Sequence, residues 1–182
     1  IDEASPRISD TDPERSSMGQ GSHAFTNTQL ARYVTAMANR GTVYELSLLD
    51  KLTDSEGNLI KDYVPEVSSV IDIQESTWDA GMRQVIAEGS AKRIFSDLAI
   101  EVAGKTGTAQ EDTRRTNHAF FVSFAPYAAP EVAVTVNIPY GYSSGNAATL
   151  AKNVYNYYYG YTTLEGIQAA GALDATAVEI QD

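Results

Sequence analysis

The sequence predicts an α/β fold of the α+β type, in which an antiparallel β-sheet is flanked by helices. The first half of the chain carries two segments with helical periodicity and, between them, a hairpin pattern. The second half carries three segments rich in β-branched and aromatic residues, followed by a last helical segment. A parallel doubly wound fold needs regular alternation of strands and helices, and this order of elements does not provide it.

A capping pattern predicts where the first helix begins. Thr26 can cap this helix with Gln29 as its reciprocal partner, and Gly41 is expected to end it. Residues 42–64 then predict a hairpin, because two short β-rich runs flank the turn-forming residues Glu56-Gly57-Asn58.

A second helix is predicted from Ile73 to Glu88. Asp72 and Glu75 have the spacing of a capping box, and Gly89 follows the last turn. The apolar stripe of this helix consists of Trp78, Met82, Val85 and Ile86.

Three antiparallel strands and a closing helix are predicted in the second half. The strands are Ile100–Ala109, His118–Ala125 and Val132–Ile138, joined by short polar or proline-containing connections. The closing helix has an apolar stripe of Ala147, Leu150, Ala151, Val154, Tyr155 and Tyr158. The body of the domain is therefore expected at residues 23–160. It lies between an extended, turn-rich linker over residues 1–22 and a frayed polar tail over residues 161–182.

The composition excludes several classes of function. Asp and Glu number 24 against 13 Lys and Arg, which gives a formal net charge of −11. Such a surface repels a phosphate backbone, so we expect no nucleic-acid partner. The chain has no cysteine, and its two histidines, His23 and His118, lack the neighbours of a metal site. We therefore expect no metal site, and nothing in the sequence implies an organic cofactor. No run approaches the ~20 apolar residues of a membrane-spanning helix.

The residues that carry chemistry are Lys105, Thr106, Gly107 and Thr108, which lie in a predicted strand. Glycine inside a strand is unfavourable unless another group must approach the backbone closely. The two threonine hydroxyls can donate to an anion, and the lysine adds a positive charge. This pattern is typical of a strand edge that holds a carboxylate beside a reacting carbonyl, although a strand with a bulge has the same letters.

Five segments, one of which contains this motif, occur along the chain in an order that is typical of a known family. They are Ser17-Met18-Gly19-Gln20-Gly21, Gly81-Met82-Arg83-Gln84-Val85-Ile86, Ala103–Gln110, Asn117–Pro126 and Pro130–Val134. Together they resemble the C-terminal part of a penicillin-binding protein transpeptidase domain, class B-like, in the superfamily of penicillin-binding proteins and serine β-lactamases. The resemblance covers residues 17 to about 160. It implies a β-lactamase/transpeptidase-like fold that is incomplete in this chain.

The resemblance implies a role for each residue of the motif. Lys105 would supply positive charge near the nucleophile and the substrate carboxylate, and Thr106 and Thr108 would hydrogen-bond that carboxylate. The backbone N–H of Thr108 would be one of two oxyanion-hole donors, and losing such a donor typically costs about 10²–10³ in rate. Gly107 would let the ligand backbone lie against the strand.

Two further motifs of the family are absent from this chain. No serine is followed three positions later by lysine, and Ser90-Ala91-Lys92 is one residue short. The letters Ser-x-Asn occur only at Ser144-Gly145-Asn146, after the Lys-Thr-Gly motif, where helix capping explains them better. We therefore expect both motifs in the N-terminal part of the same domain, on the same or a companion chain, and we expect this chain alone to be inactive.

By resemblance, the parent protein would be a peptidoglycan D,D-transpeptidase that cross-links stem peptides through an acyl-serine and binds β-lactam antibiotics. It is expected at the extracytoplasmic face of the bacterial cell membrane, held there by an N-terminal anchor. The same motif also fits a β-lactam sensor or a non-catalytic penicillin-binding scaffold. A D,D-carboxypeptidase and a serine β-lactamase are further alternatives. A Ser-His-Asp triad that uses His118 has less support, because no serine lies in a nucleophile-elbow pattern.

Overall fold

A three-stranded antiparallel sheet forms the centre of the computed structural model, which describes residues 13–14, 25–73, 78–110 and 114–173. The strands, in spatial order, are β5 (Ala103–Ala109), β6 (His118–Ala125) and β7 (Val132–Ile138). Both strand pairs keep one register over their whole length. The predicted antiparallel sheet is therefore confirmed: β6 and β7 have the predicted bounds, and only β5 begins later than expected.

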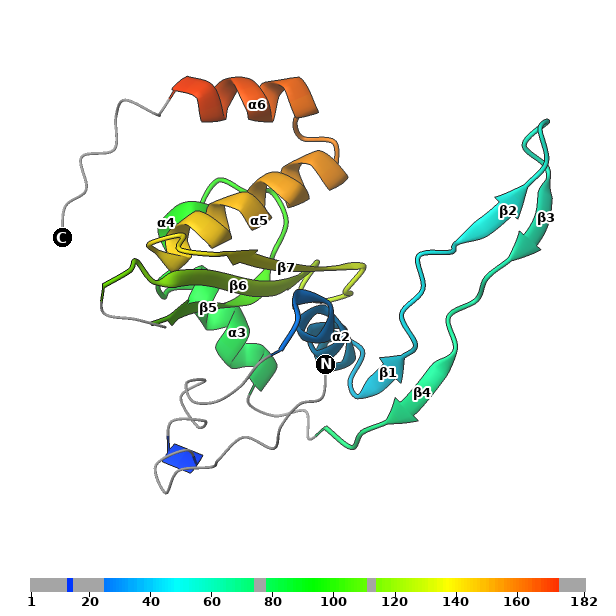
Figure 1. The fold of residues 1–182 in the computed structure, drawn as a ribbon, viewed down its shortest axis with the longest axis horizontal. Helices are drawn as coiled ribbons and strands as arrows, with labels where there is room; N and C mark the ends of the chain where they lie inside the picture. The colour runs from blue at the N-terminus through cyan, green and yellow to red at the C-terminus, as the bar shows by residue number, and fades with distance from the viewer. Residues whose placement is uncertain (1–12, 15–24, 74–77, 111–113, 174–182) are drawn as a thin grey trace.

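Helices cover both faces of this sheet, as Figure 1 shows. The α2/α3 side holds α2 (Asn27–Ala38) and α3 (Trp78–Ala87), and the α5 side holds α5 (Ser144–Tyr158) with the short α4 (Lys92–Phe95). Because strand residues alternate between faces, each side has its own apolar cluster. The cluster of the α2/α3 side includes Val34, Met82, Ala103 and Phe124. The larger cluster of the α5 side includes Phe95, Phe121, Val136, Ala151 and Tyr155.

The ends of α2 follow the predicted signals. The Thr26 hydroxyl accepts from the Gln29 backbone N–H at 3.1 Å, and the Gln29 side chain accepts from the Thr26 N–H at 2.8 Å. Gly41 has a φ of +103°, and a Cβ at this position would come within 1.9 Å of the Ile71 carbonyl oxygen. Glycine is therefore required where the chain leaves α2. The predicted start of α3 at Ile73 is wrong, because Ile73 is not helical, and the expected capping residue Glu75 lies outside the described residues.

Residues 42–70 form an arm that is longer than the predicted hairpin over residues 42–64. β1 (Thr42–Tyr44) pairs with β4 (Val67–Val70), and β2 (Lys51–Thr53) pairs with β3 (Leu59–Asp62), all antiparallel. Figure 1 shows the β2–β3 end of this arm projecting away from the central sheet. The turn lies where it was predicted, and Gly57 adopts a φ of +88° there. The returning strand β4 was missed because it is a run of only four residues beyond Pro65.

The buried row of α5 is narrower than the predicted stripe. Ala147, Ala151 and Tyr155 are fully buried, whereas three other residues of the stripe are at least 40% exposed: Leu150, Val154 and Tyr158. Residues four apart share a row on a helix. The row that includes Ala151 faces the sheet, and the described residues leave the neighbouring row largely exposed.

Part of the segment expected to be a frayed polar tail is helical. Helix α6 (Leu164–Leu173) follows α5, and the Thr163 hydroxyl accepts from the Gly166 backbone N–H at 3.1 Å in its first turn. The side chains described in α6 are exposed, apart from a half-buried Ile167. The helix was missed because its sequence, with Gly166 and Gly171, lacks a clear apolar stripe. The expected linker over residues 1–22 lies outside the described residues, apart from residues 13–14.

Candidate functional site

The four predicted site residues lie in β5, at one margin of the sheet. β5 pairs with β6 on one side, and no strand among the described residues pairs with its other side. Lys105 and Thr108 are exposed, and Thr106 and Gly107 are half-buried. The motif is thus accessible at a strand edge, where backbone N–H and C=O groups can receive an extended ligand.

Crowding at Gly104 shows which face of the sheet the two threonines occupy. A Cβ at Gly104 would come within 2.7 Å of the Phe121 ring and 3.0 Å of the Ser123 Cβ. Phe121 belongs to the cluster of the α5 side, so Gly104 faces that side. Since side chains on the same face recur every second residue, Thr106 and Thr108 lie on the α5 side as well.

Lys105 and Gly107 lie on the opposite face from the two threonines. Ala103 packs in the cluster of the α2/α3 side, and the same two-residue alternation places Lys105 and Gly107 there. The Lys105 ammonium reaches back to the strand, because its Nζ donates to the Thr106 carbonyl oxygen at 2.8 Å. The positive charge therefore lies against the β5 backbone, while its stem begins on the α2/α3 side.

The two glycines of β5 are not equally constrained by the fold. At Gly107 an added Cβ would meet only the Phe120 Cβ among described atoms, at 3.2 Å. At Gly104 it would meet three close atoms, two of them in side chains of β6. Internal packing therefore explains Gly104 better than Gly107. The role assigned to Gly107, close approach of a ligand backbone, stays a prediction.

Thr106 has a neighbour that the motif did not predict. The Ser90 and Thr106 hydroxyl oxygens lie 3.1 Å apart, and either hydroxyl can be the donor. Ser90 lies between α3 and α4, sixteen residues before Thr106. No periodic pattern in the sequence indicates a contact across this separation. From the sequence, Ser90 was considered only because Ser90-Ala91-Lys92 is one residue short of the nucleophile motif.

The Ser144-Gly145-Asn146 segment opens α5, as expected, although the capping serine is Ser143, one residue before the segment. The Ser143 hydroxyl accepts from the Gly145 N–H at 3.2 Å, and the Asn146 side-chain amide donates to the Gly141 carbonyl at 2.9 Å. His118 begins β6, and its Nδ1 accepts from the Tyr140 backbone N–H at 3.3 Å. Both segments have contacts that explain them as structural.

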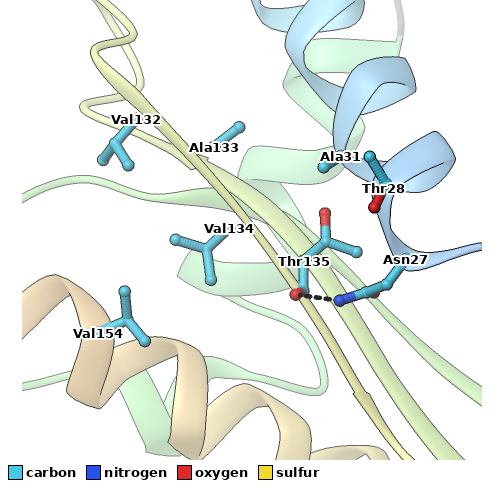
Figure 2. Close-up of a pocket in the computed structure, with 8 residues that line it drawn as sticks. All are labelled: Asn27, Thr28, Ala31, Val132, Ala133, Val134, Thr135 and Val154. Carbon is cyan, nitrogen blue, oxygen red and sulfur yellow. Dashed lines mark hydrogen bonds between the residues drawn. The ribbon is translucent and has the colours of Figure 1, made fainter. Parts of the chain in front are cut away.

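A shallow groove lies at the other margin of the sheet, away from the motif (Figure 2). Its volume is about 410 Å³, and it is lined by Asn27, Thr28, Ala31, Val132, Ala133, Val134, Thr135 and Val154. The Asn27 side-chain amide donates to the Thr135 carbonyl oxygen at 3.0 Å, so the start of α2 covers part of β7. The groove contains none of the four motif residues. Separately, none of the helices in the described part of the chain is long and apolar enough to cross a membrane.

Comparison with known proteins relates this arrangement to one family. The family model of the penicillin binding protein transpeptidase domain matches residues 4–156. The chain is 32% identical over 166 residues to the peptidoglycan D,D-transpeptidase MrdA of Haemophilus influenzae, covering 78% of this chain and 25% of the relative. Two solved structures illustrate the likeness in fold.

The first of these structures is penicillin-binding protein 2B of Streptococcus pneumoniae strain R6, with a TM-score of 0.72 and 26% identity over 85% of this chain and 28% of that one. The second is penicillin-binding protein A of Mycobacterium tuberculosis as a ceftriaxone acyl-enzyme complex, with a TM-score of 0.66 and 27% identity. The aligned region covers 78% of this chain and 34% of that structure's chain. This chain thus spans about a quarter to a third of the length of these relatives. The family match covers most of the chain, and the chain belongs to the penicillin-binding protein transpeptidase domain family.

Proposed function

We propose that this chain is the C-terminal part of a peptidoglycan D,D-transpeptidase, in which β5 holds the carboxylate and the reacting carbonyl of a stem peptide or a β-lactam. One observation carries the proposal: two hydroxyls on one face, an ammonium and a backbone edge that no described strand pairs with occur together on a single strand. These groups can bind the carboxylate and stabilise the oxyanion in acyl transfer at a carboxylate-bearing peptide, and the nucleophile is proposed in the preceding part of the domain.

The Lys105 contact supports the role of the Thr108 backbone as an oxyanion donor. The N–H and C=O of one residue in an antiparallel pair point to the same side, and successive residues alternate. The Thr106 carbonyl accepts the Lys105 ammonium, as a carbonyl at the outer edge can do. Thr108 lies two residues further, so its N–H points to the same edge and can donate to the developing oxyanion.

In the proposed reaction, a serine from the preceding part of the domain attacks the carbonyl that precedes the C-terminal residue of a stem peptide, and that residue leaves with the serine proton. The resulting acyl-serine is then attacked by an amine of a second stem peptide, which restores the serine. Thr106 and Thr108 hold the terminal carboxylate, and Lys105 balances its charge. The positive charge also favours the deprotonated form of a nearby nucleophile.

The preceding part of the domain is the proposed partner of the groove in Figure 2. Its lining is largely apolar, and it lies beside β7, which pairs only with β6 among the described strands. A further strand and its side chains can cover both the strand edge and the groove. If the two parts are expressed separately, Val154→Asp should prevent their co-purification, and unchanged co-purification would contradict this placement.

The family supports binding of β-lactams and a context in cell-wall synthesis. Within that context we propose that the parent protein acts at the extracytoplasmic face of the cell membrane, where stem peptides are cross-linked. We propose that the segment that anchors the parent protein to the membrane lies in its N-terminal part.

The deciding experiment is labelling of the full-length protein with a fluorescent penicillin. Covalent label on a serine N-terminal to this chain supports the enzyme, and stable folding without label favours a non-catalytic scaffold. Products from a stem peptide then separate the remaining alternatives. A cross-linked dimer indicates a transpeptidase and a trimmed monomer a carboxypeptidase, whereas rapid release of hydrolysed penicillin indicates a β-lactamase.

Lys105→Ala tests the site itself. In the full-length protein it should slow acylation by penicillin by about 10²-fold or more, comparable to the loss of one oxyanion donor. The melting temperature should hardly change, because Lys105 is exposed. Lys51→Ala, which removes an exposed lysine from β2 in the arm, is the matched control and should acylate at the wild-type rate. A large loss of melting temperature with Lys105→Ala would instead indicate a structural lysine.

A further inference from the structure

Ser90 is held against β5 by the turn that joins α3 to α4. The Gly89 N–H donates to the Gln84 carbonyl at 2.9 Å, and the Ala91 N–H donates to the Val85 carbonyl at 3.1 Å, so the backbone is bonded on both sides of Ser90. Ala91 is completely buried in the cluster of the α5 side. The backbone position of Ser90 is therefore set by the packing of two helices, and from there its exposed hydroxyl reaches Thr106.

A Cβ is excluded at Gly89, which shows how closely this turn is packed. It would come within 2.9 Å of the Val85 Cα and 3.1 Å of the Val85 carbonyl oxygen. Position 89 must therefore be glycine, and the next residue is the serine whose hydroxyl lies 3.1 Å from Thr106 Oγ1. The contact between the Ser90 and Thr106 hydroxyls thus joins the α3–α4 turn to β5.

The hydrogen-bonding capacity of two hydroxyls decides what this contact can do. Each hydroxyl has one proton to donate and two lone pairs to accept with. If Thr106 donates to Ser90, its proton is not available for a ligand. If Ser90 donates to Thr106, the Thr106 proton is available, and an anion on the open side of β5 selects this second arrangement. A donated hydrogen bond also polarises the Thr106 hydroxyl and strengthens its own donation.

We propose that Ser90 is a positioning residue for carboxylate recognition, because its hydroxyl donates to Thr106 and so directs the Thr106 proton toward the carboxylate of the bound peptide or β-lactam. This inference rests on the proposed function of β5. Ser90 itself does not touch the ligand and takes no part in bond making. Its contribution is therefore specific to ligands that carry the carboxylate.

The test compares two ligands that differ only in that group, benzylpenicillin and its methyl ester, in the full-length protein. Ser90→Ala should lower the second-order rate constant of acylation by benzylpenicillin by about threefold to tenfold, the usual range for one hydrogen bond. Acylation by the methyl ester, although slower in every protein, should not change between wild type and Ser90→Ala. An equal loss with both ligands, or no loss with benzylpenicillin, overturns the proposal.

A double-mutant cycle gives a second measurement that needs only benzylpenicillin. Thr106→Val removes the hydroxyl that Ser90 is proposed to orient, so Ser90→Ala should have no further effect on acylation in that background. Additive losses would show that Ser90 acts by another route and would overturn the proposal. Ser90→Thr keeps the hydroxyl and should restore the wild-type rate; failure to restore it in a protein that folds normally also counts against the proposal.

Ser96→Ala is the matched control. Ser96 is an exposed serine at the end of α4, and its hydroxyl donates to the Arg93 carbonyl at 3.2 Å instead of contacting β5. Its removal should leave acylation by both ligands unchanged, and a loss equal to that of Ser90→Ala would overturn the specific role of Ser90. Absence of acylation in the wild-type protein would be a different result, because it would contradict the proposed function before any variant is made.

Discussion

The central sheet and the arm are built from similar residues and differ in what covers them. In β6 most side chains are buried between α5 on one side and α2 with α3 on the other. In β2, β3 and β4 every residue is exposed, because no other described part of the chain covers these strands. The arm nevertheless carries apolar side chains of the kind that fill the sheet, among them Leu52, Leu59, Ile60, Val67 and Val70.

This difference shows that a strand pattern indicates backbone conformation and does not by itself indicate burial. Apolar alternation fits any pleated surface, and the free energy comes from the groups that cover it. The candidate site lies on a strand that is partly covered and partly exposed. β5 is held by packing on both faces through Gly104 and Ala103, yet Lys105 and Thr108 remain exposed. Such a strand suits a site that needs a rigid backbone and an accessible edge.

The largest expected effect separates the sheet from the arm directly. Phe121→Ala removes a fully buried ring that stacks on Phe95 with ring centroids 5.5 Å apart, and it should destabilise the full-length protein by about 3–5 kcal/mol. Leu52→Ala in β2 removes a side chain that is 48% exposed and should change stability by less than about 0.5 kcal/mol. Urea unfolding of both variants measures the difference.

Comparable losses in the two variants would break the comparison. They would mean that Leu52 is covered in the full-length protein by residues that this structure does not include. Proteolysis of the arm at native conditions gives an independent check. Cleavage confined to residues 42–70 should leave the remaining domain folded if the arm contributes little to the core.

Elements with a local signal could be predicted from the sequence, and elements that depend on tertiary contacts could not. The capping pair Thr26 and Gln29 and the bounds of β6 and β7 follow from neighbouring residues. The strand β4 was missed because its four residues are defined as a strand by their pairing with β1, at the end of the arm nearest the central sheet.

The candidate site shows the same division. Lys105 to Thr108 are contiguous, so motif and strand could be read together from the sequence. The Ser90 hydroxyl reaches Thr106 only because α3 and α4 pack on the sheet, and nothing in the letters between them indicates that contact. The buried row of α5 was only partly predicted for a related reason: periodicity finds apolar positions, but the neighbours decide which row is covered.

A smaller effect is expected inside the covered sheet, at a buried pair of hydroxyls. The Tyr155 and Ser123 hydroxyl oxygens lie 2.8 Å apart, and both residues are fully buried. Tyr155→Phe should therefore destabilise the protein by about 0.5–1.5 kcal/mol, the range for one hydrogen bond. Tyr157→Phe on the exposed side of the same helix should have no measurable effect, and an equal loss there would contradict the assignment of buried and exposed rows.

The same tyrosine gives a pH dependence with a defined sign. Burial raises the pKa of Tyr155 well above its usual value of 10.0. At a pH between the usual value and the raised pKa of the folded state, the unfolded chain binds fewer protons than the folded one. The free energy of unfolding therefore falls as pH rises above about 10. Tyr155→Phe should lose less stability than wild type between pH 7 and about pH 11. Tyr159, whose pKa is raised to about 12 mainly by burial, is present in both proteins and also raises the pKa of Tyr155 by charge repulsion.

The smallest and most local effect is expected at the tip of the arm. The Asp54 carboxylate accepts from the backbone N–H groups of Glu56 at 2.9 Å and Asn58 at 2.8 Å, and from the Asn58 side-chain amide at 2.9 Å. The bond from the Asn58 side chain contributes most to lowering the pKa of Asp54. Asp54→Ala should speed amide hydrogen exchange at Glu56 and Asn58 and leave global unfolding unchanged.

Because the pKa of Asp54 is lowered on folding, its contribution to the turn is present above the unfolded value of 3.8 and is lost as pH falls through the folded pKa. Wild-type exchange at the tip should therefore approach that of Asp54→Ala in acid, while amides of the central sheet keep their protection. Equal acceleration in β6 would show that arm and sheet unfold as one unit. Confined acceleration means that the β2–β3 end of the arm opens by itself, as expected for two strands whose residues are all exposed.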